Sequence, residues 1–201
     1  MKRRKQLPSS KSIRKIVKRS TVANAVGDSP RLAIPVTVER DHVDGQFNAP
    51  LTLVEYGDYQ CPFCGAAYPE VKKVQKALGS KLRFVFRNFP ITSLHEFAER
   101  AAETAEAAGA QGKFWEMHNF LYEHQDLLAD HDSILAHAAR LRLNVQRLEK
   151  EIAQHSYLNK IKEDFNGGVR SGVNGTPTFY INGTRYNGSP IANDLLEILS
   201  D

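Results

Sequence analysis

The feature that most constrains this chain is a pair of cysteines, Cys61 and Cys64, placed where a predicted strand passes into a predicted helix. Residues 51–56 form an apolar, β-branched run of the length expected for a buried strand. Residues 62–78 follow with apolar side chains roughly on one helical face, and Gly79 ends that pattern. The chain of 201 residues has no other cysteine, so these thiols are expected to be present for their reactivity and not as part of a disulfide framework.

The start of a helix is a favourable place for a reactive thiol. Unpaired backbone N–H groups and the helix dipole stabilise an anion there, so the sequence predicts that Cys61 is a thiolate. Pro62 suits the first helical position, which needs no N–H. Cys64 lies one turn further along the same face, within the distance that a disulfide spans. We therefore expect Cys61 to attack and Cys64 to resolve the mixed disulfide that forms.

The main alternative for two neighbouring cysteines is half of a zinc site. Such a site needs four ligands, but the chain has no second C-x-x-C motif and no closely spaced pair among its seven histidines. The glycine-rich residues 167–175 lack the spacing of a phosphate-binding loop and follow a predicted helix. We therefore expect neither a metal site nor a cofactor.

The order of the predicted elements indicates an α/β fold. Residues 82–89 alternate as a second strand, so strand, helix and strand follow one another as in the βαβ unit of a parallel sheet. Residues 178–186 form a predicted hairpin with Asn-Gly at its turn, and residues 191–199 form a closing helix. Residues 36–39 alternate weakly and indicate a further strand ahead of all these.

Between the second strand and the hairpin, every segment is predicted to be helical. The predicted helices span residues 94–108, 113–124, 134–142, 145–153 and 156–166. The dipeptide Gly167-Gly168 is expected to end the last of them. These helices form a predicted insertion of about residues 93–170 within one folded domain, residues 36–201.

The basic charge of the chain is concentrated at its start. Residues 1–19 hold nine of the 27 Lys and Arg residues and no acid, which leaves 18 basic and 23 acidic residues in the rest. The body of the protein is therefore acidic, and we do not expect it to bind nucleic acid. Residues 1–35 are predicted to be a disordered basic tail and linker, with a short surface helix around Ile13 as the alternative.

The same end of the chain bears on the compartment. Residues 2–5 resemble the charged start of a signal peptide, but no uninterrupted apolar stretch follows them. We therefore expect a cytoplasmic protein, with export as the alternative. No run of about 18 apolar residues exists, so no transmembrane helix is expected.

Two further positions near the cysteines are candidates for a role. Glu55 lies within the predicted buried strand, where burial raises the pKa of a carboxyl group and makes it a possible proton acceptor for Cys64. The alternative is an outward-facing Glu55 on a half-exposed strand. Pro177 follows Thr176 at the entry to another predicted strand. Because only about 5–6% of X–Pro bonds are cis, sequence physics alone favours a trans bond there.

Three segments together resemble a known family. They are residues 53–64 (LVEYGDYQCPFC), 84–90 (FVFRNFP) and 172–179 (GVNGTPTF). In this order they are similar to the bacterial DsbA-like thiol–disulfide oxidoreductases, and the similarity runs from about Asp41 to the C-terminus. The resemblance implies a thioredoxin fold, with a central mixed sheet and an inserted all-helical subdomain.

The resemblance also implies roles for single residues. Cys61 would be the nucleophile, Cys64 the buried resolving thiol and Glu55 the family's buried acid. The Thr176–Pro177 bond would be cis and face the cysteines. The residues that would contact the substrate are Pro62, Phe63, Thr176 and Pro177. Phe63 stands where the best-known oxidase of the family has histidine, which leaves the direction of electron flow open.

The function that follows is disulfide exchange by an enzyme. Its partners would be protein or peptide thiols and disulfides together with a redox partner of unknown identity, and we expect a monomer. The alternative is a thioredoxin-like binding or chaperone module that its basic tail docks to a membrane or a nucleic acid. The two cysteines favour the enzyme, because a scaffold would need neither of them.

Overall fold

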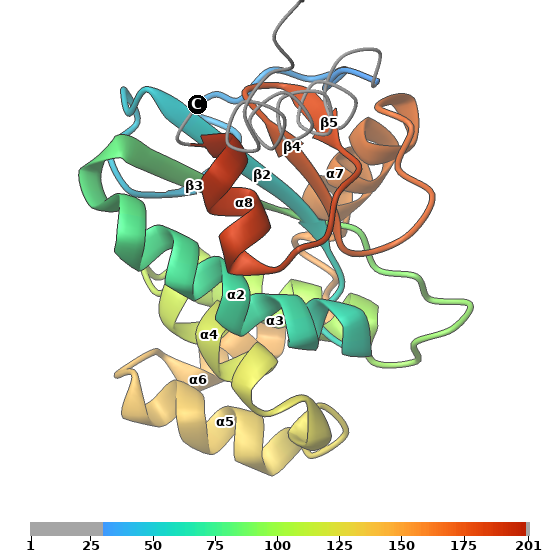
Figure 1. The fold of residues 1–201 in the computed structure, drawn as a ribbon. Coiled ribbons are helices and arrows are strands. Elements are labelled where there is room, and N and C mark those ends of the chain that lie inside the picture. The colour runs from blue at the N-terminus through green and yellow to red at the C-terminus, as the bar shows by residue number, and fades with distance from the viewer. Residues whose placement is uncertain (1–29, 200–201) are drawn as a thin grey trace, which may run out of the picture.

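A computed structural model of the chain describes residues 30–199. Their fold is a five-stranded mixed sheet with helices on both faces (Figure 1). The strands are β1 (His42–Asp44), β2 (Leu51–Gly57), β3 (Leu82–Asn88), β4 (Thr178–Ile181) and β5 (Thr184–Tyr186). The helices are α2 (Pro62–Leu78), α3 (Ala98–Gly109), α4 (Phe114–Glu123), α5 (His131–Arg140), α6 (Val145–Ala153), α7 (Leu158–Arg170) and α8 (Ala192–Leu199). Two short 3-10 turns, η1 (Gly79–Lys81) and η2 (Gln125–Leu127), complete the list.

The strand order in the sheet is β1-β3-β2-β4-β5. β2 and β3 are parallel and joined by α2, which confirms the predicted βαβ unit, and all other neighbours are antiparallel. The central strand β2 is buried from its second residue to its last, as its apolar and β-branched composition predicts. The expected thioredoxin fold with a mixed sheet is therefore confirmed.

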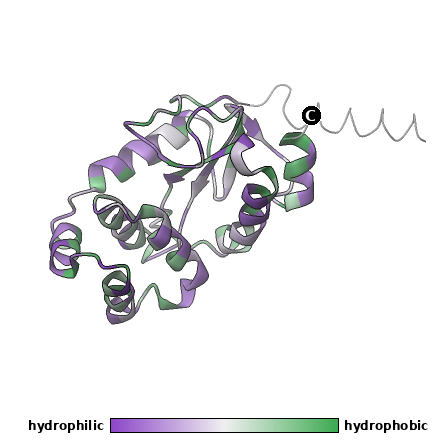
Figure 2. Ribbon diagram, turned by 90° about the vertical axis from the view of Figure 1, so that its left-hand side faces the viewer, coloured by the Kyte–Doolittle hydropathy of each residue, from purple (hydrophilic) through white to green (hydrophobic). Residues whose placement is uncertain are grey.

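The two faces of the sheet are covered differently. On one face α2 and α8 lie side by side, and the buried residues there form one large cluster with those of α3 and α4 (Figure 1). On the other face a smaller cluster around Val54 and Tyr180 is covered by α7 and by residues 32–36. Helices α5 and α6 lie at the end of the molecule farthest from the sheet. Hydrophilic and hydrophobic residues alternate along the helices, as amphipathic helices require (Figure 2).

The first strand differs from the expectation. Residues 38–40 form a turn, and the strand begins only at His42, so the strand predicted at 36–39 is wrong. The reason is a tertiary contact: Asp41 accepts hydrogen bonds from the backbone N–H of Thr37 and from the buried guanidinium of Arg87. This carboxylate pulls the chain into a turn where weak alternation alone predicted an extended strand.

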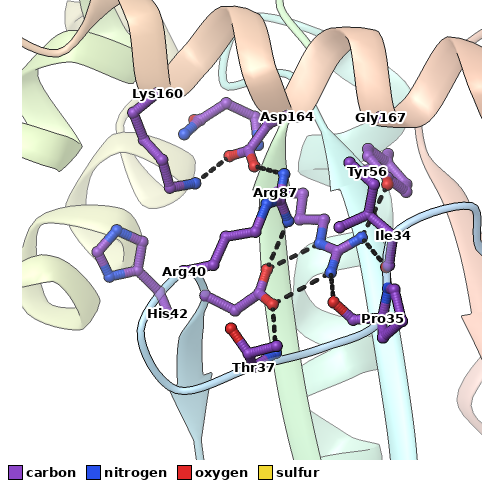
Figure 3. A network of polar contacts seen from close by, with 12 residues as sticks. Ile34, Pro35, Thr37, Arg40, His42, Tyr56, Arg87, Lys160, Asp164 and Gly167 are labelled. Atoms are coloured by element: carbon purple, nitrogen blue, oxygen red, sulfur yellow. Dashed lines mark hydrogen bonds and ion pairs between the residues drawn. The ribbon is translucent and has the colours of Figure 1, made fainter.

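Arg87 is the centre of a buried polar network beneath this turn (Figure 3). Its side chain is fully buried, and it pairs with Asp41 at 2.8 Å. It also donates to the carbonyl oxygens of Ile34 and Pro35 and to the Tyr56 hydroxyl. Residues 34 and 35, which the sequence placed in the linker, are thus tied to β3. The disordered basic tail, or short surface helix, expected ahead of them lies in residues 1–29, outside the described residues.

The last helix of the predicted insertion also ends later than expected. Gly167 and Gly168 do not end α7, which continues to Arg170. A Cβ at Gly168 would lie 2.7 Å from the Phe89 ring and 3.0 Å from the Tyr56 ring. These glycines therefore allow α7 to approach the sheet closely. Sequence alone cannot distinguish glycines that permit such packing from glycines that end a helix.

The other expected helices agree with the structure to within a few residues at each end. The helix expected from residue 94 shows the largest delay at its start and begins at Ala98. The preceding residues form turns instead, and the backbone N–H of Phe97 donates to the Gln60 side chain at 2.6 Å. No helix within residues 30–199 is both long and apolar enough to cross a membrane.

Candidate active site

The two cysteines lie at the junction between β2 and α2. Cys61 is the N-cap residue of the helix, with φ −67° and ψ 121°, and Pro62 occupies the first helical position. No side chain caps this end of the helix, so the N–H groups of the first turn remain available to the Cys61 sulfur. The predicted placement of a thiol at a helix start is confirmed.

The two thiols are chemically unlike. The pKa of Cys61 is lowered to about 5, first by a hydrogen bond from the Cys64 thiol and further by backbone N–H groups of Phe63 and Cys64, against the opposing effect of burial. Burial is the largest cause that raises the pKa of Cys64 well above its ordinary value. Cys61 therefore is a thiolate at neutral pH, whereas Cys64 keeps its proton.

The segment ahead of β4 comes up to the nucleophile from the opposite side. The Thr176–Pro177 bond is cis, which confirms the expectation from the family resemblance and not the trans bond that base rates favour. The Cys61 Sγ atom lies 3.4 Å from the Thr176 carbonyl oxygen. The pairing of Thr178 in β4 with Tyr56 in β2 brings these distant parts of the chain together.

Glu55 lies below the pair in the middle of β2. Its side chain is 3% exposed, so the alternative of an outward-facing carboxylate is wrong. In the sheet it stands next to Phe86 and Phe179, both in the same cluster as Cys64. Burial, and then the charge of the Cys61 thiolate, raise the pKa of Glu55 to about 8.

The Glu55 carboxyl group is incompletely paired. Its Oε1 atom is buried and has no hydrogen-bond partner within residues 30–199. The same holds for the Tyr122 hydroxyl, which lies against Gly57, two residues further along β2. Burial with one oxygen unpaired disfavours the charged form and moves the carboxyl pKa toward the neutral range, which is what a proton acceptor for Cys64 requires.

The residues expected to contact a substrate differ in exposure. Pro62 and Phe63 are exposed, and the Phe63 ring is 72% exposed although it is large and apolar. Thr176 and Pro177 are half-buried beside Cys61. Cys61 itself is 4% exposed, and its sulfur contacts this group of residues through the Thr176 carbonyl oxygen.

Sequence reasoning missed Asp58, which organises the loop before Cys61. Its buried carboxylate accepts hydrogen bonds from the backbone N–H of Gln60 at 2.8 Å and of Ile91 at 2.8 Å, and it contacts His95 Nδ1 at 2.7 Å. Its backbone carbonyl accepts from the Cys61 N–H. An aspartate directly after a strand end was the available signal, since such residues commonly organise turns.

Sequence reasoning also missed Gln125, which belongs to η2 in the inserted helical segment. Its Nε2 atom donates to the carbonyl oxygens of Tyr59 at 2.7 Å and of Cys61 at 2.9 Å. No sequence pattern marks this residue, because it lies more than 60 positions away from the cysteines. Within residues 30–199 no group of His, Cys, Asp and Glu side chains is arranged to hold a metal ion.

Comparisons with known proteins agree with this geometry. The model of a thioredoxin family matches residues 37–201. Among solved structures, the chain is similar to oxidised BdbD from Bacillus subtilis, with 22% identity, 88% of this chain and 96% of that chain covered, and a TM-score of 0.72. It is also similar to a thioredoxin-like oxidoreductase from Silicibacter pomeroyi, with 28% identity, 80% and 91% coverage and a TM-score of 0.65.

The curated relatives of the chain are named as antiporters and not as thioredoxin-like proteins. A Na(+)/H(+) antiporter NhaA 1 of Salinispora arenicola is 46% identical over 158 residues, which are 79% of this chain and 24% of that protein. A protein of the same name from Mycolicibacterium vanbaalenii is 38% identical over 84% of this chain and 28% of its own length. The chain thus spans about a quarter of the length of these relatives, and their name describes proteins that are mostly outside the match.

Proposed function

The chain belongs to this thioredoxin family and is a thiol–disulfide oxidoreductase. We propose that its Cys61–Cys64 pair passes a disulfide to the thiols of protein substrates. The observation that carries this direction is the contrast between the two thiols. A low pKa of Cys61 stabilises the reduced pair, and a stabilised reduced form makes the disulfide form a stronger oxidant.

The reaction has two exchange steps. A substrate thiolate attacks Cys61 Sγ of the oxidised pair, which forms a mixed disulfide, breaks the Cys61–Cys64 bond and releases Cys64 as a thiolate. Glu55 returns a proton to this buried thiolate. A second substrate thiolate then attacks the substrate sulfur of the mixed disulfide and releases Cys61 as a stable thiolate. The substrate loses two electrons and the pair gains them.

The substrate is held by the surfaces that border Cys61. The backbone of Thr176 is next to the sulfur and suits an extended peptide, which would pair with it as an added strand does. Pro177, Pro62 and Phe63 provide apolar contact that does not depend on a particular sequence. A monomer suffices for this chemistry, because the Cys61–Cys64 pair, Glu55 and these contact surfaces come from one chain.

The direction of exchange also bears on the compartment and the partner. Disulfide donors act where thiols are oxidised, so the proposal favours the exported location over the cytoplasmic one. A separate redox partner must then accept two electrons from the reduced pair. Alkylation of free thiols in fractionated cells tests this: an oxidised Cys61–Cys64 pair outside the cytoplasm is expected, and a reduced pair in the cytosol contradicts it.

The reduction potential of the pair tests the direction. We expect a value well above that of thioredoxin, about −270 mV, and nearer to those of known disulfide donors, about −120 to −180 mV. A value at or below that of thioredoxin would show that the chain is a reductant.

The variant Cys64→Ser tests the two-step exchange. It should form stable mixed disulfides through Cys61 with disulfide-containing protein substrates, since no second thiol remains to resolve them. Non-reducing gels detect such adducts, and the double variant Cys61→Ser/Cys64→Ser is the control. A Cys64→Ser protein that forms no thiol-sensitive adduct would contradict the proposed roles of the two cysteines.

A further inference from the structure

The glycine at position 65, inside α2, is explained by a tertiary contact with Gln125. Gly65 follows Cys64 in the first turn of the helix, where glycine is a poorer helix former than alanine. A Cβ at this position would fall 2.8 Å from the Gln125 Cδ atom and still closer to its Oε1 atom. The absence of a side chain at residue 65 therefore provides the space that the Gln125 amide occupies.

The Gln125 amide uses this space to hold the loop that carries the nucleophile. Its two N–H protons go to the carbonyls of Tyr59 and Cys61, one on each side of Gln60. Because both partners are acceptors, they fix which end of the amide is nitrogen. The Cys61 carbonyl also accepts the first hydrogen bond of the helix, from Gly65 N–H at 3.1 Å. Gln125 thus acts on the backbone of the N-cap residue itself.

From these contacts we propose that Gln125 is a positioning residue for Cys61, through which the helical insertion sets the reactivity of the nucleophile. The Cys61 thiolate is stabilised by the Cys64 thiol, by the Thr176 side chain and by the N–H groups of the first turn. The contacts with Cys64 and with the first turn depend on the backbone angles of Cys61. Gln125 holds these angles from η2, between α4 and α5. Without it, the loop loses two hydrogen bonds to its backbone carbonyls and keeps its contacts with Asp58, with the backbone of Phe97 and with the helix.

The inference makes a specific prediction about two variants in separate parts of the chain. Gln125→Met keeps the approximate shape of the side chain and removes both donors. Gly65→Ala leaves Gln125 intact but places a methyl group where its amide lies. In each variant the Cys61 pKa should rise by half a unit or more, which lowers the thiolate fraction at acid pH about threefold.

The double variant Gly65→Ala/Gln125→Met makes the test sharper. If Gly65 acts only by admitting the Gln125 amide, alanine at residue 65 should have no further effect once the amide is absent. The double variant should therefore show the pKa of Gln125→Met alone, and not the sum of two shifts. Asp126→Asn, an exposed neighbour in the same turn, is the matched control and should leave the pKa unchanged.

The measurement is the rate of Cys61 alkylation by iodoacetamide as a function of pH, on reduced proteins whose folding is checked by circular dichroism. This readout needs no protein substrate, so it can fail without the proposed function failing. Unchanged pKa values in both folded single variants would overturn the inference, and so would additive shifts in the double variant. If Gln125→Met does not fold, Gln125→Asn, whose shorter amide cannot reach both carbonyls, takes its place with the same expected shift.

Discussion

At the scale of single residues, the active site depends on giving two identical side chains opposite properties. Cys61 and Cys64 are three positions apart, yet only Cys61 is at the helix end. Cys64 is one turn deeper, has no exposed surface and donates to Cys61. The hydrogen bond from the Cys64 thiol lowers the pKa of Cys61 and raises the pKa of Cys64. The difference in burial between the two cysteines therefore sets which of them attacks first.

Alkylation of the reduced protein should distinguish the two thiols. Labelling of Cys61 by iodoacetamide should reach half its maximal rate near pH 5, and Cys64 should stay unlabelled through neutral pH. Cys64→Ala should raise the Cys61 pKa, because the Cys64 thiol is the largest cause of its lowering. Peptide mapping identifies the labelled residue, and preferential labelling of Cys64 would contradict the assignment.

Glu55 should make the stability of the reduced protein depend on pH. The folded pKa of about 8 lies above the ordinary 4.5, so the folded state binds this proton more tightly than the unfolded state does. The resulting stability is fully present below pH 4.5 and is lost as the pH rises through about 8. Relative to Glu55→Gln, wild type should therefore lose stability over this range.

Urea unfolding of both reduced proteins at a series of pH values measures this difference. A constant difference between wild type and Glu55→Gln from pH 4.5 to 8 would show that folding does not raise the pKa of Glu55. The same variant should slow turnover near neutral pH, because glutamine cannot exchange a proton with Cys64. Its circular dichroism spectrum should match that of wild type.

At the scale of elements, β3 connects the active-site face of the sheet to the other face. Phe86 packs in the same cluster as the cysteines, whereas the next residue, Arg87, points into the buried network on the opposite face (Figure 3). This alternation is the ordinary period of a strand. It lets one strand support the site with apolar contacts and hold residues 34–41 with charged ones.

Arg87→Met should destabilise the protein strongly without changing the chemistry of the cysteines. The substitution removes the buried cation that Asp41 pairs with at 2.8 Å and leaves this carboxylate with the cation of Arg40, at 3.1 Å. Breaking such a buried pair costs up to about 3–5 kcal/mol. The double variant Arg87→Met/Asp41→Asn should cost less than the sum of the two single variants. Urea unfolding measures the loss, and the Cys61 pKa should stay near its wild-type value. A large shift of that pKa would show that the network and the site are coupled.

At the scale of the whole molecule, the start of the described chain is part of the fold. The backbone N–H of Leu32 donates to Gly183 in the β4–β5 turn, and that of Ala33 donates to Ser171 after α7. Together with the contacts from Arg87, these bonds tie residues 30–35 to the sheet. Residues 30–35, which the sequence assigns to the linker, are therefore held against the folded domain.

Two truncations distinguish the enzyme from a module that depends on its basic tail. A protein that starts at Pro30 should oxidise a reduced protein substrate as fast as the full chain, because the residues placed at the site all lie between 55 and 177. A protein that starts at Val36 should be destabilised by roughly 1–3 kcal/mol, because Arg87 loses two buried acceptors. Loss of activity on removing residues 1–29 alone would favour the docking module.

Much of the fold could be predicted because its signals are local. The apolar run of β2, the helical period of α2 and the Asn-Gly turn between β4 and β5 each specify their own element. The errors occur where a distant residue overrides a local signal. The contact between Asp41 and Arg87 places residues with a strand-like alternation in a turn. The glycines in α7, which elsewhere would end a helix, instead leave room for the rings of Tyr56 and Phe89.

The sequence by itself determined the chemistry of this protein, because a C-P-F-C motif at a strand–helix junction places two thiols at a helix start. Only the tertiary structure decided how that chemistry is tuned. The depth of Glu55, the approach of Thr176 and the hold of Gln125 on Cys61 depend on contacts between segments 6 to 115 residues apart. Such contacts leave no pattern in a sequence, because each is made by one ordinary side chain or carbonyl that packing brings into place.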